Sequence, residues 1–443
     1  MLKGNSNNNS IKKFIRTLGP GLITGASDDD PSGIVTYSQA GARFGLATLW
    51  TALITFPLMA AIQEMCARIG LVTSVGLTTT LKNHYPKAAL YAMMIFSIPA
   101  IILNIGADIA GMGAVANLLI PAVKPMVFSI IFTLILLLII ILLPYNKIVS
   151  VLKYLCLSLF LYIAVPFFTN PDWLMVLKST FVPVITPSKA FFEVLVAILG
   201  TTISPYLFFW QVTMEAEDVK KGKNLLLARR KLIRGSNDHE HHKMREKNLF
   251  RLLIKKMQLD VNVGMLLSNM VMFFIILATG TALFCNGINQ VDTVEQAAKA
   301  LEPVAGQASS FLFAMGVIGT GFLAIPVLSG SLSYIVAETF GWKGNLDKKF
   351  GKAKEFYLII IISLIVGLLI NYIGISPMKA LIYTAILYGV TSPIIIAIVL
   401  HIGNNKKIMG SYTNSMLSNS LGLLALILMT VAAVALIYFQ FTN

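Results

Sequence analysis

Stretches of about twenty apolar residues recur along the whole chain, and they constrain its fold more than any other feature. Hydrophobic residues make up 56% of the 443 residues, charged residues only 12%, and the mean hydropathy is +0.77. An apolar segment of about 20 residues is long enough to cross the hydrocarbon core of a bilayer as a helix. The sequence therefore predicts an all-α integral membrane protein and excludes an ordinary soluble domain.

Eleven such segments can be distinguished, and most of the loops between them are short. We predict transmembrane helices at residues 18–43, 46–69, 88–119, 126–144, 148–168, 190–214, 258–286, 305–338, 355–374, 378–401 and 418–440. A polar tail at residues 1–17 precedes them, with no sign of a cleaved signal peptide. The longest polar stretch, residues 215–256, is expected to be a cytoplasmic loop. No room remains for a separate soluble domain.

The net charge of +15 arises from basic residues in the loops, which indicates membrane topology and no nucleic-acid partner. With the N-terminus inside, 29 of the 35 Lys and Arg residues lie on the cytoplasmic side. The six outside are Arg43, Lys124, Lys178, Lys189, Lys299 and Lys379. Because cytoplasmic loops carry an excess of Lys and Arg, we predict a cytoplasmic N-terminus and an external C-terminus in the plasma membrane.

The first apolar segment is interrupted by Ser27-Asp28-Asp29-Asp30-Pro31-Ser32-Gly33. A carboxylate near the bilayer centre costs roughly 3 kcal/mol, so such groups usually face a cavity and have a function. Pro31 removes a backbone donor and disfavours a helical Asp30, while Gly33 weakens the next turn. We therefore expect a broken helix whose freed carbonyls line an enclosed cavity. In the alternative, the aspartates cap a helix that begins at Pro31 just outside the membrane.

The sixth segment carries a second interruption, Gly200-Thr201-Thr202-Ile203-Ser204-Pro205. Two interrupted segments at corresponding places of two five-helix halves are typical of transporters with inverted repeats and a site at mid-membrane. We therefore predict one repeat at residues 18–168 and a second at residues 190–401, with the segment at 418–440 outside both. The alternative is that Pro205 only kinks an ordinary helix.

If the two interruptions face each other, they form a site made of oxygen atoms. The expected metal ligands are the Asp30 carboxylate, backbone oxygens at Gly33 and Thr201, and the Ser204 hydroxyl. No Cys, Met or His lies at either interruption, so selection of softer metals by sulfur or imidazole is not expected. Such a set suits a hard ion that keeps some of its water, as Mg²⁺ does. Asp28 and Asp29 point elsewhere and would form a negatively charged access path for cations.

Four motifs resemble the natural resistance-associated macrophage protein (NRAMP) family of divalent metal transporters. They are Leu18-Gly19-Pro20-Gly21-Leu22, Asp30-Pro31-Ser32-Gly33, Gln63-Glu64-Met65-Cys66-Ala67-Arg68-Ile69-Gly70 and Gly200-Thr201-Thr202-Ile203-Ser204-Pro205. The resemblance covers essentially all eleven segments. It implies the leucine-transporter fold, with two inverted five-helix repeats, broken helices 1 and 6, and alternating access to an ion site between them.

The departures from the family pattern concern the metal ligands and the proton path. Family members that carry Mn²⁺ and Fe²⁺ have Asp-Pro-Gly-Asn and Met-Pro-His, where this chain has Gly33, Ser204 and Tyr206. A second family histidine aligns with Gln211, and the Asp-x-x-Glu pair reads Asp108-Ile109-Ala110-Gly111. Asp108 is either a remnant of the proton relay or a structural group. The pattern resembles the NRAMP-related magnesium transporters, in which transport of Mg²⁺ goes without proton coupling.

Two polar features away from the interruptions have structural explanations. Glu64 and Arg68 lie one helical turn apart, and we predict a structural ion pair between them. His239, His241 and His242 in the 215–256 stretch could bind a transition metal, but a solvated, charged loop is the more frequent explanation for such a cluster. We leave these histidines out of the predicted site.

The sequence therefore predicts a secondary transporter that imports divalent cations by alternating access, with Mg²⁺ as the first cargo and Mn²⁺ tolerated. It predicts no enzyme activity, no catalytic cofactor and no obligate protein partner. The nearest alternative is a proton-coupled Mn²⁺/Fe²⁺ transporter. Two alternatives of other classes are a sodium-coupled carrier of organic solutes, which the run Asp28 to Asp30 disfavours because it repels carboxylates, and a metal sensor that signals through residues 215–256.

Overall fold

The structure is a computed structural model that describes residues 20–442, except residues 144–146, 148–155 and 233–238. For residues 156–158, 221, 223–232, 239–249 and 442 it describes the backbone alone. The predicted tail at residues 1–17 lies outside the described residues, as do the side chains of His239, His241 and His242. Every regular element in the described part is a helix.

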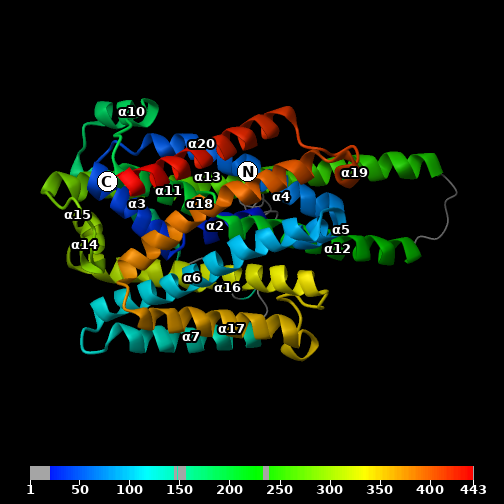
Figure 1. Cartoon of the computed structure of the whole chain (residues 1–443), viewed down its shortest axis with the longest axis horizontal. Coiled ribbons are helices and arrows are strands. Elements are labelled where there is room, and N and C mark those ends of the chain that lie inside the picture. Colours follow the sequence, from blue (N-terminus) through cyan, green and yellow to red (C-terminus); the bar gives the residue numbers. More distant parts are fainter. Residues whose placement is uncertain (1–19, 144–146, 148–155, 233–238, 443) are drawn as a thin grey trace, which may run out of the picture.

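Nine helical stretches of the described chain are long and apolar enough to cross a membrane. Their helices are α4 (Trp50–Thr73), α6 (Lys87–Leu119), α7 (Pro125–Leu142), α11 (Lys189–Thr202) with α12 (Pro205–Leu232), α13 (His239–Ala282), α16 (Ser309–Phe340), α17 (Lys354–Ile370), α18 (Pro377–Asn404) and α20 (Met416–Thr442). Each matches a predicted segment, and they run roughly parallel along the long axis of the molecule (Figure 1).

The other two predicted segments are not continuous helices in the described chain. The first consists of α2 (Pro20–Asp28) and α3 (Pro31–Phe44), which are too short to count singly as spans. The fifth is described only from the 3₁₀ turn η1 (Cys156–Ile163) and α9 (Val165–Thr169) onward, because residues 148–155 lie outside the described part. The total of eleven transmembrane helices therefore stays a prediction.

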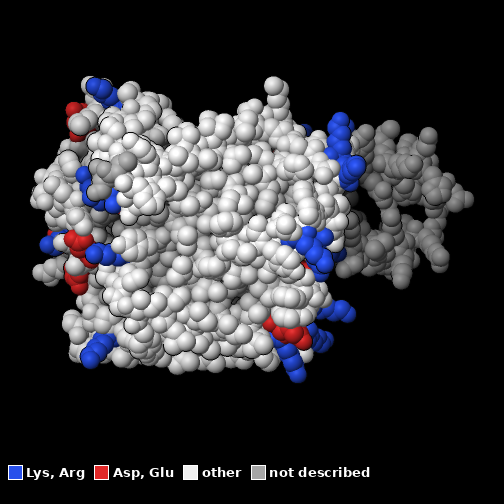
Figure 2. All heavy atoms as spheres, viewed as in Figure 1, with Lys and Arg blue, Asp and Glu red and all other residues white. Residues whose placement is uncertain are grey.

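Short helices cover the two ends of the bundle. They are α5 (Leu77–His84), α10 (Trp173–Phe181), η2 (Phe284–Asn286), α14 (Val294–Ala298), η3 (Lys299–Leu301), α15 (Glu302–Ala305), η4 (Gly306–Ala308), η5 (Phe350–Lys352), η6 (Asn371–Ile373) and α19 (Lys406–Met409). On the face shown in Figure 2, charged side chains gather at the two ends and the broad band between them is uncharged. An uncharged band flanked by charge is the surface expected of a membrane-embedded bundle.

The polar stretch at 215–256 was predicted as a loop, and this prediction is wrong. Helix α12 continues to Leu232 and α13 begins at His239, so both helices project beyond the rest of the bundle (Figure 1). Lys, Arg, Glu and Leu are good helix formers in water, so polarity marks where a helix leaves the membrane and not where it ends. The C-terminal end of α20 lies at the opposite end of the molecule from these projections (Figure 1).

Helix α2 packs against α13 with unusually close backbones. A Cβ atom on Gly264 would collide with the carbonyl oxygen of Gly21, and one on Gly21 would lie 2.7 Å from the Cα atom of Val261. We call this close contact of α2 and α13 at Gly21 and Gly264 the glycine seam. At its end, Asp260 accepts hydrogen bonds from the backbone N–H groups of Gly21 (2.7 Å) and Leu22 (3.3 Å). A side chain of α13 thus caps the first turn of α2 and fixes its position.

We expect Gly264→Val to destabilise the protein by about 1–3 kcal/mol, because the new side chain forces α2 away from α13. Thermal unfolding of the purified protein in detergent would show this as a lower Tm. Gly222→Ala in α12 is the matched control, since no described atom lies within 4 Å of a Cβ placed there. A Tm for Gly264→Val equal to that of the control would contradict the close packing.

Candidate functional site

Both predicted helix interruptions are present, and each separates two helices. Helix α2 ends at Asp28 and α3 begins at Pro31, with Asp30 in an extended conformation (φ −71°, ψ 171°) as the N-cap. Asp30 therefore caps α3, as in the alternative. The alternative placed this cap just outside the membrane, but Asp30 is buried in the protein, with only 2% of its surface exposed. At the second interruption α11 ends at Thr202 and α12 begins at Pro205, so Pro205 does more than kink one helix.

The two interruptions lie against each other in the protein interior. A Cβ atom on Gly33 would be 3.1 Å from the hydroxyl oxygen of Thr201, so a larger residue here would press against the Thr201 side chain. The Tyr206 hydroxyl donates to the carbonyl oxygen of Ser27 (2.8 Å), one of the carbonyls left free at the end of α2. The predicted residues Gly33, Thr201 and Tyr206 are thereby brought to one place.

Three donors surround the Asp30 carboxylate. Its Oδ1 accepts from the backbone N–H of Gly33 and from the Ser32 hydroxyl, each at 2.8 Å, and its Oδ2 accepts from the Asn104 amide of α6 at 2.9 Å. The same amide lies 3.5 Å from Oδ2 of Asp108, one turn further along α6. Asn104 therefore connects the predicted metal ligand Asp30 with the buried carboxylate of Asp108.

Asp28 and Asp29 point away from Asp30, as predicted, but they do not line an open path. They are 0% and 4% exposed, and both contact the Ser268 hydroxyl of α13, at 2.9 Å and 3.2 Å. A hydroxyl has one hydrogen, so Ser268 can donate to only one of these carboxylates at a time. In this conformation they belong to the interface between α2 and α13.

At the second interruption, Ser204 is engaged with its own backbone. Its hydroxyl lies 2.6 Å from the carbonyl oxygen of Thr201 and 3.2 Å from that of Gly200. The Thr201 carbonyl, predicted as a metal ligand, is thus already an acceptor. The Thr201 hydroxyl oxygen is buried and has no hydrogen-bond partner among the described residues. The hydroxyls of Thr201 and Ser204 keep lone pairs that a cation could use.

Gln211 and Tyr206 take part in contacts that extend beyond the interruptions. The Gln211 amide oxygen accepts from the Thr24 hydroxyl of α2 (2.5 Å), and its amide nitrogen donates to Glu215 (3.3 Å). The Tyr206 ring lies 5.8 Å from that of Tyr388 in α18. These side chains join α12 to α2 and α18 around the interruptions.

Comparison with known proteins assigns the family. Residues 21–439 match the profile of the family described as natural resistance-associated macrophage protein-like. The chain belongs to the NRAMP family. The divalent metal cation transporter MntH of Caldanaerobacter subterraneus is 23% identical over 94% of this chain and 90% of its own. The protein of the same name from Clostridium acetobutylicum is 23% identical over 98% of this chain and 93% of its own.

Solved structures confirm the predicted fold. The manganese transporter of Eremococcus coleocola, in complex with an aromatic bis-isothiourea compound, has a TM-score of 0.70 and 18% identity, covering 100% of this chain and 90% of that one. MhsT in complex with L-phenylalanine has a TM-score of 0.56 and 11% identity over 95% and 97% of the two chains. The leucine-transporter fold expected for an NRAMP protein is therefore confirmed.

Four polar residues of this NRAMP site were missed from the sequence: Asn104, Ser268, Glu215 and Asp260. Asn104, Ser268 and Asp260 lie in α6 and α13, outside the two interrupted segments, whereas Glu215 lies in α12 itself. Glu215 is the one with a usable signal, because it follows Gln211 by one helical turn. It was instead placed at the start of the predicted loop. Among the described residues, no group of three or more His, Cys, Asp or Glu is arranged to hold a metal.

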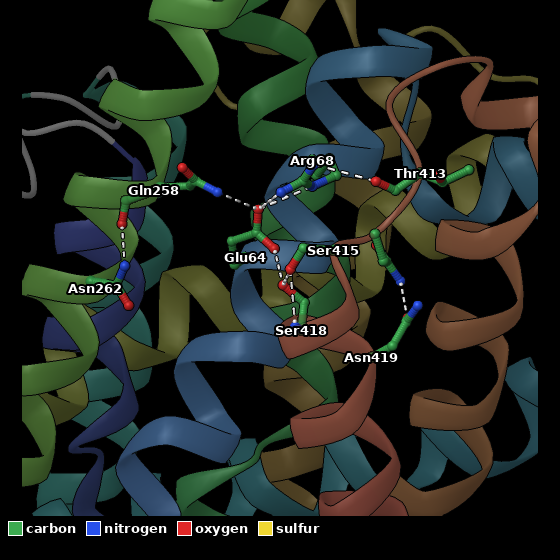
Figure 3. Close-up of polar contacts among 9 residues, drawn as sticks. Glu64, Arg68, Gln258, Asn262, Thr413, Ser415, Ser418 and Asn419 are labelled. Atoms are coloured by element: carbon green, nitrogen blue, oxygen red, sulfur yellow. Dashed lines mark hydrogen bonds and ion pairs between the residues drawn. The ribbon is translucent and has the colours of Figure 1, made fainter.

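Away from the interruptions, the predicted ion pair of Glu64 and Arg68 is confirmed (Figure 3). Arg68 binds Glu64 through Nε (3.0 Å) and Nη2, and Gln258 of α13 donates to the same carboxylate oxygen (3.2 Å). Ser418 of α20 donates to its other oxygen (3.2 Å). The pair thereby ties α4 to α13 and to the start of α20, which is a structural role.

We expect Arg68→Met to cost about 3–5 kcal/mol, because it leaves the buried Glu64 carboxylate without its cation. The double variant Glu64→Leu/Arg68→Met removes both charges and should lie closer to wild type. Thermal unfolding of the three proteins in the same detergent checks this order. A single variant as stable as the wild type would show that the pair is not needed.

Proposed function

We propose that this NRAMP protein is a membrane transporter of divalent metal cations, with the cation bound between the interruptions at α2–α3 and α11–α12. The observation that carries the proposal is a buried carboxylate, Asp30, at the break of a helix that faces a second broken helix. Intramembrane carboxylates are costly and are typical of ion pathways. Family membership and the printed name of the relatives, divalent metal cation transporter, support the same function.

In this proposal Asp30 supplies the negative charge, and neutral oxygens complete the shell. The hydroxyls of Thr201 and Ser204 and the carbonyls freed around Gly33 are the nearby candidates. Alternating access requires the helices around this buried site to separate on one side and then on the other. Helix α2 is held against α13 by the glycine seam and by Asp260. We propose that release of the cation breaks these contacts, so that α2 moves relative to α13.

The cargo is a choice between two ions. The solved structure with a TM-score of 0.70 is that of a manganese transporter, so the comparisons favour Mn²⁺, which was the alternative at the level of sequence. The set of ligands is compatible with Mg²⁺ as well, since the interruptions offer carboxylate, hydroxyl and carbonyl oxygens and no sulfur or imidazole. Such ligands suit Mg²⁺ and Mn²⁺ alike. We therefore propose that both ions are transported, and that softer metals are transported poorly.

Coupling to protons also stays open to test. Gly111 and Gln211 replace titratable groups of the family pattern, and Leu381 packs 2.9 Å from a Cβ atom built on Gly111. These two positions favour transport without protons. The buried carboxylates Asp108 and Glu215 lie close to the proposed path and are the titratable groups that the proton-coupled alternative would use. A pH measurement during metal uptake distinguishes the two alternatives.

The remaining features are proposed with the same function. We propose that the protein resides in the plasma membrane with a cytoplasmic N-terminus, and that it acts without enzymatic chemistry or a catalytic cofactor. A sodium-coupled carrier of organic solutes is disfavoured by the buried aspartates of the first interruption. A sensor that binds metal without moving it is separated from a transporter by a flux assay.

We expect Asp30→Asn to lower metal uptake at least about thirtyfold, since loss of a buried charge partner costs about 2 kcal/mol or more. Uptake of Mn²⁺ and Mg²⁺ into proteoliposomes measures it. Asp172→Asn is the matched control, because Asp172 is an exposed N-cap of α10 and Asn caps about as well. Near-normal uptake by Asp30→Asn would refute the site.

The cargo and the coupling are tested together by uptake into liposomes that contain a metal-sensitive dye and, in parallel, a pH dye. We expect entry of both Mn²⁺ and Mg²⁺ under an imposed membrane potential. If protons are not coupled, the lumen keeps its pH during entry; acidification in proportion to metal would establish the proton-coupled alternative. Entry of Mn²⁺ with none of Mg²⁺ would remove Mg²⁺ as a cargo.

A further inference from the structure

The hydrogen bonds on Asp30 restrict how this carboxylate can bind a cation. An ionised carboxylate has about four acceptor positions, two on each oxygen. The Gly33 N–H and the Ser32 hydroxyl, both at 2.8 Å, fill the two positions of Oδ1. The Asn104 amide, at 2.9 Å, takes one position of Oδ2. One position on Oδ2 is left for a cation.

A carboxylate with one free position binds a cation through a single oxygen. Ca²⁺ takes six to eight oxygen ligands and often binds a carboxylate through both oxygens at about 2.3–2.6 Å, whereas Mg²⁺ keeps an octahedral shell at about 2.0–2.1 Å with several waters. Mn²⁺ also suits an octahedral oxygen shell. Single-oxygen binding therefore disadvantages Ca²⁺ and leaves the two smaller ions unaffected.

Of the three donors, the Ser32 hydroxyl is the one that decides whether a cation binds Asp30 through one oxygen or through both. The Gly33 N–H belongs to the N-cap geometry of α3 and is always present. Removal of Asn104 would free a second position on Oδ2, but Oδ1 would stay filled. Removal of the Ser32 hydroxyl frees a position on Oδ1, so that each oxygen has one and binding through both becomes possible.

The Ser32 hydroxyl cannot turn away at no cost. The side chain is fully buried, and Oδ1 of Asp30 is the hydrogen-bond partner that the described residues give it. A buried donor that leaves its acceptor pays the desolvation of an unsatisfied group. Binding of Ca²⁺ through both oxygens would force this rotation.

We propose that Ser32 is a positioning residue that selects against Ca²⁺ by holding Asp30 to single-oxygen coordination. This inference rests on the proposed transport of divalent cations and deepens it, since it names the residue that excludes the larger ion. It concerns the ratio of affinities for two ions and attributes that ratio to one hydroxyl, so a variant that disturbs the site elsewhere serves as its control.

The test is the dissociation constant of Mg²⁺, Mn²⁺ and Ca²⁺, titrated into the purified full-length protein in detergent. In Ser32→Ala we expect the ratio Kd(Ca²⁺)/Kd(Mg²⁺) to fall on the order of tenfold, with Kd(Mn²⁺)/Kd(Mg²⁺) unchanged. Ser32→Gly removes the same hydroxyl and should agree. Asn104→Leu should weaken all three ions and keep the Ca²⁺ ratio.

Ser329→Ala is the matched control, because this buried serine of α16 donates to the carbonyl oxygen of Ile325 in its own helix. The inference is overturned if both Ser32 variants keep the wild-type Ca²⁺ ratio, or if Asn104→Leu lowers it as much as they do. Wild-type protein that binds neither Mg²⁺ nor Mn²⁺ would instead overturn the proposed function. The two failures are therefore distinguishable.

Discussion

The cost of burying the Asp30 carboxylate is the constraint on which the other features of the site depend. A buried charge has to be compensated by hydrogen bonds or by an ion, and three donors from two parts of the chain converge on this one. One of them, the Gly33 N–H, is available because the helix is broken at Pro31, which leaves the N–H groups of the first turn of α3 unpaired. The break and the charge thus support each other: the break supplies a backbone donor for the carboxylate, and the carboxylate caps the new helix.

The broken helices also need support from continuous ones. Helix α13 provides it on one side through the glycine seam with α2, the Asp260 cap and the Ser268 hydroxyl between Asp28 and Asp29. Helix α18 provides it at the second break, where the Ser392 hydroxyl donates to the carbonyl oxygen of Ile203 (3.0 Å). Short helices with unpaired ends keep a fixed place in a membrane protein only when neighbours satisfy those ends.

The sequence was sufficient for features whose cause is local. Apolar length predicted nine of the spans, and Pro31, Gly33 and Pro205 predicted both breaks, because backbone restrictions act within a few residues. It was insufficient where a partner comes from a distant helix. Asn104 contacts Asp30 across 74 positions and Ser268 contacts Asp28 across 240, and nothing in an apolar helix says which way one polar residue faces. The prediction of a loop at 215–256 was wrong for another reason: polar residues indicate where the chain is exposed to solvent, and they do not indicate where a helix ends.

A site made only of oxygen atoms cannot select its ion by the softness of its ligands, so selection has to come from number and geometry. Mg²⁺, Mn²⁺ and Ca²⁺ all accept carboxylate, hydroxyl and carbonyl oxygens, and they differ in how many ligands they take and at what distance. In the proposed site, hydrogen bonds to the one charged ligand would act as selectivity elements, because each of them uses a lone pair that a larger ion would need. The three hydrogen bonds on Asp30 would then limit its coordination of a cation before any other ligand is counted.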